Sequence, residues 1–366
     1  MGPASSRKSL MEGLGFRQED DLRSASFPER PLDARRLRAL YLDLLGRPPL
    51  LEERREWSQK RFDTLVDGLL GTEEFWNAWL EEQLYYFLLV DNFRPTSERV
   101  LSAPRDLHTG RIGVREALHR ILLSASFDRR NPGPDTFVTV VMEQLLGATV
   151  KKSPRDLEIG KRVYDGTPGS FLGRNGSSQA DIVRIAIEDR QALRHFLERE
   201  HLRLLRAEPD SRELAGWVRQ LESNEASYPA ILRSWFLSQG YEQRLERLAP
   251  LPNGAFVRAL FVDLTDALPS EDEAQRMRNA LDGLADAGPL RSVLARLLID
   301  SGNAHIPSRQ DIENPSAWIA AMFERFLGRS ASAEESRVFV QAFTDPVCRP
   351  QTVVYAIVSH PEYQTW

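Results

Sequence analysis

The segment LYLDLLGRPPLLEERREW, residues 40–57, decides how the fold of the chain is interpreted. Apolar side chains spaced i, i+3, i+4 and i+7 mark one face of a helix, and four residues here have that spacing: Leu37, Leu40, Tyr41 and Leu44. Gly46 follows this face directly, where a helix readily ends in a left-handed residue. A proline pair and acidic residues then introduce a second helix. The segment therefore predicts two helices joined by a short turn.

The same pattern returns along the chain. In the first copy a proline, a glutamate and an aromatic residue follow the anchor Leu44 at five, nine and thirteen residues. The copies are Pro49, Glu53 and Trp57 after Leu44; Pro209, Glu213 and Trp217 after Leu204; Pro269, Glu273 and Met277 after Leu264; and Ala331, Glu335 and Phe339 after Phe326. A longer copy follows Leu145, with Pro154 and Glu158 in the later places. Each proline is expected in the first turn of the second helix, and the recurrence predicts a repeat array.

The predicted fold is all-α: tandem helical-hairpin repeats in about five degenerate copies, without a significant sheet, since no run of alternating polarity is long enough for a strand. The organisation we expect, in chain order, is a flexible N-terminal leader at 1–28; a first repeat with an aromatic-rich inserted helix at 29–135; the second and third repeats, with a glycine-rich loop at 164–178, at 136–248; and the fourth and fifth repeats at 249–366.

Two stretches carry a resemblance to known proteins. LYLDLLGRPP with LVDGLLGTEEFWNAW resembles the uncharacterised helical domain of planctomycete cytochrome-associated proteins. MFERFLGRSASAEESRVF with AIVSHPEYQ is similar to a tandem helical domain of unknown function in bacterial surface proteins. Phycobilisome linkers are similar in having an LGR sequence between two helices. The resemblance implies a helical fold and no particular reaction. Members of the first family commonly carry a haem-binding CxxCH motif, and this chain departs from them because Cys348 is its single cysteine.

Composition narrows the functional classes. The chain has 366 residues, of which 42% are hydrophobic and 28% charged, and its net charge is −5. A duplex-binding surface would leave a basic excess, so we do not expect nucleic acid as the partner. No stretch approaches 18 uncharged apolar residues, so we expect no transmembrane segment. A single cysteine gives no internal disulfide and fits a reducing compartment, for which the cytoplasm is the simplest choice.

A pair of Glu-x-x-His motifs is the sharpest catalytic candidate. In four-helix bundles, two such motifs and two further carboxylates hold a di-metal centre. The residues that would form this set are Glu82, Glu116, His119, Glu143, Glu198 and His201. In the repeat register, however, His201 takes the place held by Tyr41 in the first copy, which favours a core side chain with one ring nitrogen hydrogen-bonded. The metal site is therefore the alternative interpretation.

The glycine-rich segment YDGTPGSFLGRNGSSQAD, residues 164–181, is the second candidate. Backbone N–H groups where a loop meets a helix start can hold an anion. The candidate anion-binding residues are Gly169, Gly173, Arg174, Gly176, Ser177 and Ser178. The spacing matches neither phosphate-binding glycine motif, and Ser178 with Asp181 resembles an ordinary helix cap. We therefore favour a structural Ω-type loop here.

The run FWNAWLEEQLYYFLLVDNFRP, residues 75–95, carries more aromatic side chains than one helix face can bury on a single neighbour. The favoured interpretation is a central helix packed on several sides. The alternative is a surface for a partner, formed by Trp76, Trp79, Tyr85, Tyr86 and Phe93.

The repeats favour a non-enzymatic interaction or scaffold protein whose exposed helical faces bind another protein, since repeat arrays present extended surfaces. We expect no cofactor. The alternative is a helical-bundle di-metal oxidoreductase or a phosphate-binding protein. The identity of the partner and the oligomeric state are left open by the sequence.

Overall fold

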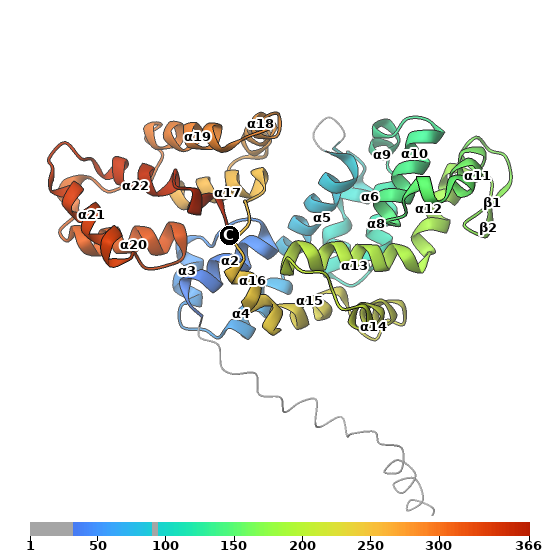
Figure 1. Ribbon diagram of the computed structural model, residues 1–366, viewed down its shortest axis with the longest axis horizontal. Coiled ribbons are helices and arrows are strands. Elements are labelled where there is room, and N and C mark those ends of the chain that lie inside the picture. The colour runs from blue at the N-terminus through green and yellow to red at the C-terminus, as the bar shows by residue number, and fades with distance from the viewer. Residues whose placement is uncertain (1–31, 90–93) are drawn as a thin grey trace, which may run out of the picture. The chain divides into compact units, whose positions relative to one another are not determined.

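The computed structural model describes residues 32–89 and 94–366, and this part of the chain is all-α, as predicted (Figure 1). Its helices connect through short turns. In chain order they are α2 (Ala34–Leu45), α3 (Leu51–Trp57), α4 (Phe62–Leu70), α5 (Glu73–Leu88), α6 (Glu98–Leu101), α7 (Ala103–His108), α8 (Val114–Leu122), α9 (Ala125–Arg130), α10 (Pro134–Val140), η3 (Val141–Leu145), η4 (Val150–Lys152), α11 (Pro154–Tyr164), α12 (Gln179–Glu188), α13 (Arg190–Leu205), α14 (Ser211–Glu222), α15 (Tyr228–Phe236), α16 (Gln239–Glu246), α17 (Asn253–Thr265), α18 (Glu271–Asp282), α19 (Gly288–Asp300), η5 (Arg309–Asp311), α20 (Pro315–Leu327), α21 (Ala333–Thr344), α22 (Pro350–Val358) and η6 (Pro361–Gln364).

The first helix of each predicted copy ends in the same way. The residue two places after each anchor has a left-handed backbone, with φ between 52° and 66°: Gly46, Gly147, Arg206, Asp266 and Gly328. The predicted left-handed ends at Gly46 and Gly328 are confirmed. At both, glycine avoids the steric cost that a Cβ would bring in this conformation. The number of copies stays a prediction.

The second helices begin one step later than expected. Pro49, Pro209 and Pro269 each lie one residue before the N-cap, outside the first helical turn. At this position proline holds the extended backbone that leads into the cap, and the missing N–H costs no helical hydrogen bond. Only the longer copy has its proline, Pro154, as the first residue of its helix, α11.

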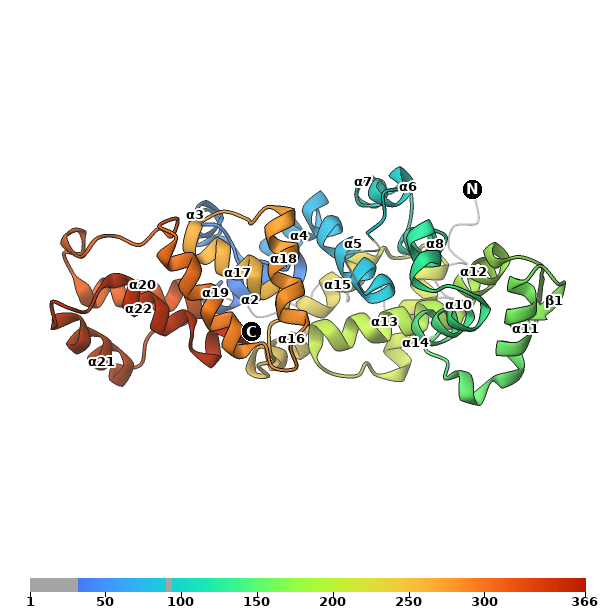
Figure 2. The same cartoon turned by 90° about the horizontal axis from the view of Figure 1, so that it is seen from above.

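Two hydrophobic cores share α2. The first core combines side chains from α2 to α16, and the second combines side chains from α17 to η6. Every residue of α2 from Leu37 to Leu45 is buried, and Leu42 packs into the second core while its neighbours pack into the first. Figures 1 and 2 show α2 and α17 between the first-core helices and the helices α19 to α22. The predicted boundaries at 29, 136 and 249 stay predictions, and the proposed leader at 1–28 lies outside the described residues.

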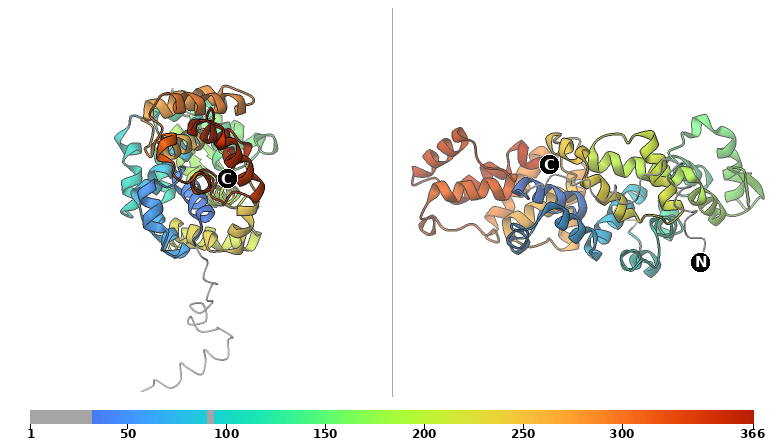
Figure 3. Two further views of the ribbon diagram at one scale, coloured as in Figure 1. Left: turned by 90° about the vertical axis from the view of Figure 1, so that its left-hand side faces the viewer. Right: turned by 90° about the horizontal axis from the view of Figure 1, so that it is seen from below.

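Buried charged groups connect the two cores. Asp43 of α2 accepts hydrogen bonds from the Tyr241 hydroxyl at 2.9 Å, from Arg244 at 2.5 Å and from Trp366 Nε1 at 2.7 Å. Because Trp366 reaches α2, the C-terminal residue lies beside this central helix, as Figure 3 also shows. Burial and the adjacent Asp43 carboxylate hold the pKa of Tyr241 well above its usual value, so this hydroxyl stays a donor.

Asp263 of α17 occupies the equivalent place, one residue before the anchor Leu264, and is also buried. It pairs with Arg38 of α2 at 2.8 Å and accepts from the Tyr363 hydroxyl at 3.0 Å. Burial disfavours the charged form of Arg38, but the Asp263 carboxylate outweighs this effect and raises the Arg38 pKa. The Arg38–Asp263 ion pair, which has lost its hydration, therefore ties α2 of the first core to α17 of the second.

The glycine-rich segment is a two-stranded antiparallel hairpin, in contrast to the predicted Ω-type loop. Strand β1 (Gly169–Phe171) pairs with β2 (Arg174–Gly176), and the turn residues Leu172 and Gly173 both have positive φ, at 47° and 76°. Such a turn matches the twist of paired strands. Phe171 is fully buried against the first core and holds the hairpin in place. With three residues in each strand, the alternation was too short to detect from the sequence.

Candidate functional site

The arginine of each LGR sequence, Arg47 or Arg329, binds two glutamates beside the end of a helix. Arg47, three residues after the anchor Leu44, binds both oxygens of Glu53 at 2.7 and 2.8 Å. It also binds both oxygens of Glu74, at the start of α5, at 2.6 and 2.9 Å. We call Arg47, Glu53 and Glu74 the first arginine clamp. The clamp fixes α3 and α5 to the end of α2, because the guanidinium fork matches two carboxylates at once.

The second arginine clamp repeats this arrangement atom for atom. Arg329, three residues after Phe326, binds Glu335 at 2.8 and 2.9 Å and Glu362 at 2.5 and 2.6 Å. The hydrogen bond from Arg329 lowers the pKa of the Glu335 carboxyl to about 2. In the copies anchored at Leu204 and Leu264 the corresponding residue is alanine, Ala207 or Ala267, so the clamp is restricted to copies that begin with an LGR sequence.

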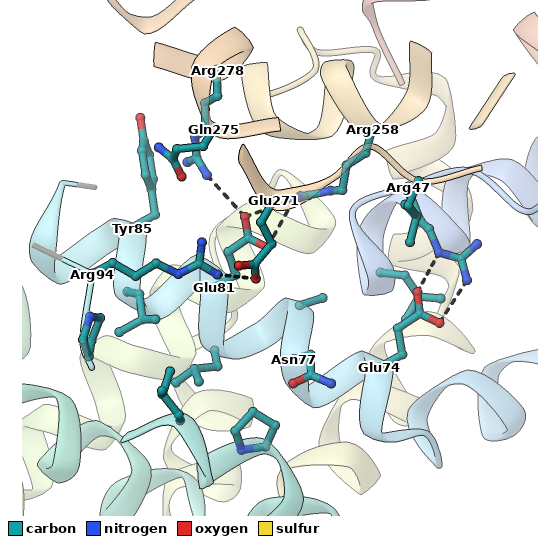
Figure 4. A pocket seen from close by; sticks show the side chains of 18 of the residues that line it. Arg47, Glu74, Asn77, Glu81, Tyr85, Arg94, Arg258, Glu271, Gln275 and Arg278 are labelled. Carbon is teal, nitrogen blue, oxygen red and sulfur yellow. Dashed lines mark hydrogen bonds and ion pairs between the residues drawn. The ribbon is translucent and has the colours of Figure 1, made fainter. Parts of the chain in front are cut away.

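A cleft of about 380 Å³ lies next to the first clamp. The α5–α18 cleft, as we call it, is bounded by the end of α2, by α5, by residues 94–104, and by α17 and α18 (Figure 4). Its apolar lining comes from separate elements: Leu45, Leu80, Leu84, Leu88, Leu101 and Leu268. Two of these side chains are substantially exposed, Leu101 at 48% and Leu268 at 50%. A leucine that is half accessible in a concave site marks a surface suited to an apolar ligand group.

The charged groups of the cleft bind one another. Glu81 of α5 accepts from Arg258 of α17 at 3.0 and 3.2 Å and lies 3.6 Å from Arg278 of α18. Burial alone would raise the pKa of the Glu81 carboxyl, but Arg258 and Arg278 outweigh burial and lower it. Arg278 also stacks on the Tyr85 ring, 3.7 Å from its centroid. These contacts join the first core to α17 and α18 across the base of the cleft.

The predicted partner surface is wrong for its two tryptophans. Trp76 and Trp79 are only 5% and 2% exposed, because α5 lies against α2, α7, α8 and α9 and is covered on several sides. This arrangement agrees with the favoured interpretation of the aromatic run. Tyr85 lines the cleft, whereas Tyr86 stacks under Arg199 and donates to the Gln144 carbonyl. Phe93 lies outside the described residues.

The proposed anion-binding loop is occupied by its own side chains. Ser178 caps α12 by accepting from the Asp181 N–H, and the Ser177 N–H donates to the Asp181 carboxylate at 3.0 Å. Arg174 pairs with Glu188 at 2.8 Å. Gly176 packs closely, since a Cβ there would lie 2.9 Å from the Asp181 Cβ, and Gly169 and Gly173 complete the hairpin. The glycines thus serve chain packing and turn geometry at this site.

The six predicted metal ligands are not brought together, and no group of three or more metal-binding side chains occurs in the part of the chain that the structure describes. The alternative prediction of a di-metal arrangement is therefore wrong for this set. His201 packs between Trp217 and Trp235, and its Nδ1 lies 2.7 Å from the Ala207 carbonyl. Burial lowers the pKa of His201, which favours a neutral ring in the core.

The other members of the set have separate partners. Glu116 contacts Arg99, Arg120 and His119 beside a separate hollow of about 970 Å³ that α8 lines. Glu198 pairs with Arg194 within α13, and Glu143 is exposed. Glu82 of α5 is half-buried. The carboxylates of the set therefore have different neighbours and do not converge on one point.

Sequence reasoning did not identify the clamps or the cleft. The clamp had a sequence signal: arginine at three and glutamate at nine residues after the anchor, in the first and last copies. The cleft had none, because Glu81 and Arg258 are 177 residues apart. None of the helices in residues 32–89 and 94–366 has the length and apolar character that a membrane crossing requires. Comparison with known protein families, with curated proteins and with solved structures finds no match for this chain.

Proposed function

We propose that the protein is a non-enzymatic scaffold that binds a segment of another protein in the α5–α18 cleft. The observation that carries this proposal is the exposure of Leu101 and Leu268 inside a concave site whose charged lining groups already have protein partners. Removing apolar surface from water lowers the free energy. Burial of these leucines by a partner is therefore favourable by about 25 cal/mol per Å² of apolar surface.

The charges support a protein partner over nucleic acid. The chain carries a net charge of −5, and a phosphate backbone requires a basic surface. The arginines of the cleft are engaged by Glu74, Glu81 and Glu271. We also propose a cytoplasmic location, which rests on the single cysteine.

The experiment is site-directed photo-crosslinking in the native host. A photoreactive residue replaces Leu268 in one variant and Leu297 in another; Leu297 is 61% exposed on α19 and does not line the cleft. We expect a discrete cross-linked protein from position 268 and none from position 297. The same adduct should be lost when Leu101→Gln is added to the position-268 variant, because the substitution removes apolar lining. Equal adducts at both positions, or an adduct insensitive to Leu101→Gln, would contradict the proposal.

A further inference from the structure

Most of the exposed charged side chains of the α5–α18 cleft are negative, although its lining contains residues of both signs. The side chains of the three lining glutamates are widely accessible: Glu74 at 44%, Glu81 at 45% and Glu271 at 80%. Three of the four lining arginines are recessed: Arg47 at 4%, Arg278 at 11% and Arg258 at 16%. An incoming molecule therefore meets leucines and carboxylates first. Arg94, at 50%, is the exception, and it pairs with Glu271 at 2.8 Å.

The recessed arginines already have carboxylate partners in the chain. Arg47 uses its fork on Glu53 and Glu74. Arg258 donates to the Gly46 carbonyl at 2.9 Å and to both oxygens of Glu81. Arg278 lies near Glu81 and Asp282 and covers the Tyr85 ring (Figure 4). A partner carboxylate would have to reach arginines that are recessed and already paired, whereas a partner ammonium or guanidinium meets the more exposed glutamate side chains first.

The apolar part of the cleft suits side chains presented from one helical face. Its leucines come from α2, α5, α6 and the turn before α18, and its volume of about 380 Å³ accommodates a few side chains rather than a whole domain. Amphipathic helices bind grooves of this kind through anchors at i, i+3 or i+4, and i+7.

We infer that the occupant of the α5–α18 cleft is an amphipathic helix of a partner protein that carries leucine-type anchors flanked by lysine or arginine. The inference rests on the proposed function and adds the chemistry of the partner. The leucine anchors contact Leu101 and Leu268, and the flanking cations contact Glu74, Glu81 and Glu271. Charge complementarity of this type sets which partner is accepted and how fast it associates.

The test uses the full chain and two synthetic helical peptides of about 15 residues. Both carry leucines at i, i+4 and i+7; one has lysines at the flanking positions and the other has glutamates. Fluorescence anisotropy at low salt measures binding. We expect the lysine peptide to bind about tenfold more tightly than the glutamate peptide. Leu268→Gln should weaken the lysine peptide about tenfold, and Leu297→Gln should leave it unchanged.

A matched pair of charge variants separates the cleft from the general negative charge. Glu271→Gln should weaken lysine-peptide binding about threefold. Glu334→Gln is the control, because Glu334 is 69% exposed and pairs with Arg337 at 2.6 Å, far from the cleft lining. Equal effects of the two variants, or tighter binding of the glutamate peptide, would overturn the inference. A positive cross-link from position 268 would then still support the proposed function.

A second copy of the chain is the competing occupant. Sedimentation velocity of the wild type and of Leu268→Gln decides this point. A concentration-dependent dimer that disappears in Leu268→Gln would place a second copy in the cleft and overturn the inference, whereas identical sedimentation of both proteins leaves the cleft for a partner helix.

Discussion

The two arginine clamps use the same atoms, yet the hollows beside them differ. The α5–α18 cleft, next to the first clamp, measures about 380 Å³, and the hollow next to the second clamp measures about 160 Å³. Four residues after the second glutamate of each clamp, the chain places Ala78 in the first hollow and Trp366 in the second. The same clamp geometry thus borders a larger hollow where this residue is small and a smaller hollow where it is large.

Trp366 is held in the second hollow from several sides. Its Nε1 donates to Asp43, and the guanidinium groups of Arg206 and Arg244 lie 4.3 and 5.3 Å from its ring centroid. Burial and the neighbouring Arg244 lower the pKa of Arg206 to about 10, so the Arg206 guanidinium remains charged at neutral pH and favours the ring face. These contacts indicate that Trp366 contributes to stability.

The largest effect we expect comes from removing the group that anchors Trp366. Asp43→Ala leaves Arg244, itself 1% exposed, without its carboxylate, and releases Tyr241 and Trp366. Loss of one partner of a buried ion pair costs about 3–5 kcal/mol of unfolding free energy. Urea denaturation, followed by tryptophan fluorescence, measures the change.

The control for this prediction removes both charges. Asp43→Leu with Arg244→Met should recover at least half of the lost free energy, because an apolar pair has no uncompensated charge. A cost below about 1 kcal/mol for Asp43→Ala would mean that the Asp43 network does not hold the second hollow closed.

The two clamps should differ in strength because they differ in burial. The Arg47 side chain is 4% exposed and that of Arg329 is 33% exposed, although their hydrogen bonds are the same. We expect Arg47→Ala to cost about 2 kcal/mol and Arg329→Ala about 1 kcal/mol or less, since solvent screens the second set of pairs. Chemical denaturation of the two variants gives the comparison. Equal costs would show that burial does not distinguish the clamps. Arg47→Lys should recover little of the unfolding free energy lost in Arg47→Ala, because lysine cannot bind both glutamates through a fork.

Low pH should weaken the second clamp. The pKa of Glu335 is about 2 in the folded chain, below its model-compound value of 4.5. A lowered folded-state pKa stabilises the fold above the unfolded-state pKa, and this contribution disappears as the pH falls from about 4.5 to about 2. We expect wild type to exceed Glu335→Gln by about 1 kcal/mol at pH 6, a figure reduced for solvent screening, and the difference to vanish near pH 2. A difference independent of pH would contradict this assignment.

Local features of the fold were predictable, and those that depend on distant neighbours were not. The helix ends at Gly46 and Gly328 follow from a few consecutive residues, since a glycine after an apolar helical face is sufficient to indicate a left-handed end. The core position of His201 followed from its repeat register. Trp76 and Trp79 pack against Tyr228 of α15, and Trp79 also against Phe196 of α13, far along the chain, and no short pattern shows that packing.

The candidate site was least accessible to sequence reasoning. Its walls meet only after α17 and α18 pack beside α5, as Figure 2 shows, and its central ion pair joins residues from the two cores. Glu81 lies next to Glu82, a metal ligand only in the alternative interpretation of the sequence, and the arginines that bind Glu81 come from α17 and α18, far along the chain. Charge and periodicity in the sequence identify the faces of single helices. Predicting a cleft also requires knowing how the faces of two helices lie relative to each other.

The smallest effect on stability, and the sharpest test of the comparison, is Ala78→Trp. This substitution gives the first hollow the residue that the second one has, in a site with about 380 Å³ of free space. We expect the unfolding free energy to change by less than about 1 kcal/mol, because the new ring enters empty space, and binding of the lysine peptide to fall at least about tenfold. Ala320→Trp on α20 is the control, since Ala320 is exposed and does not line the cleft. If Ala78→Trp binds the peptide like the wild type, the open hollow is not the docking site. If Ala78→Trp loses peptide binding while Ala320→Trp keeps it, the size of the side chain at position 78 determines whether the hollow beside the first clamp can bind the peptide.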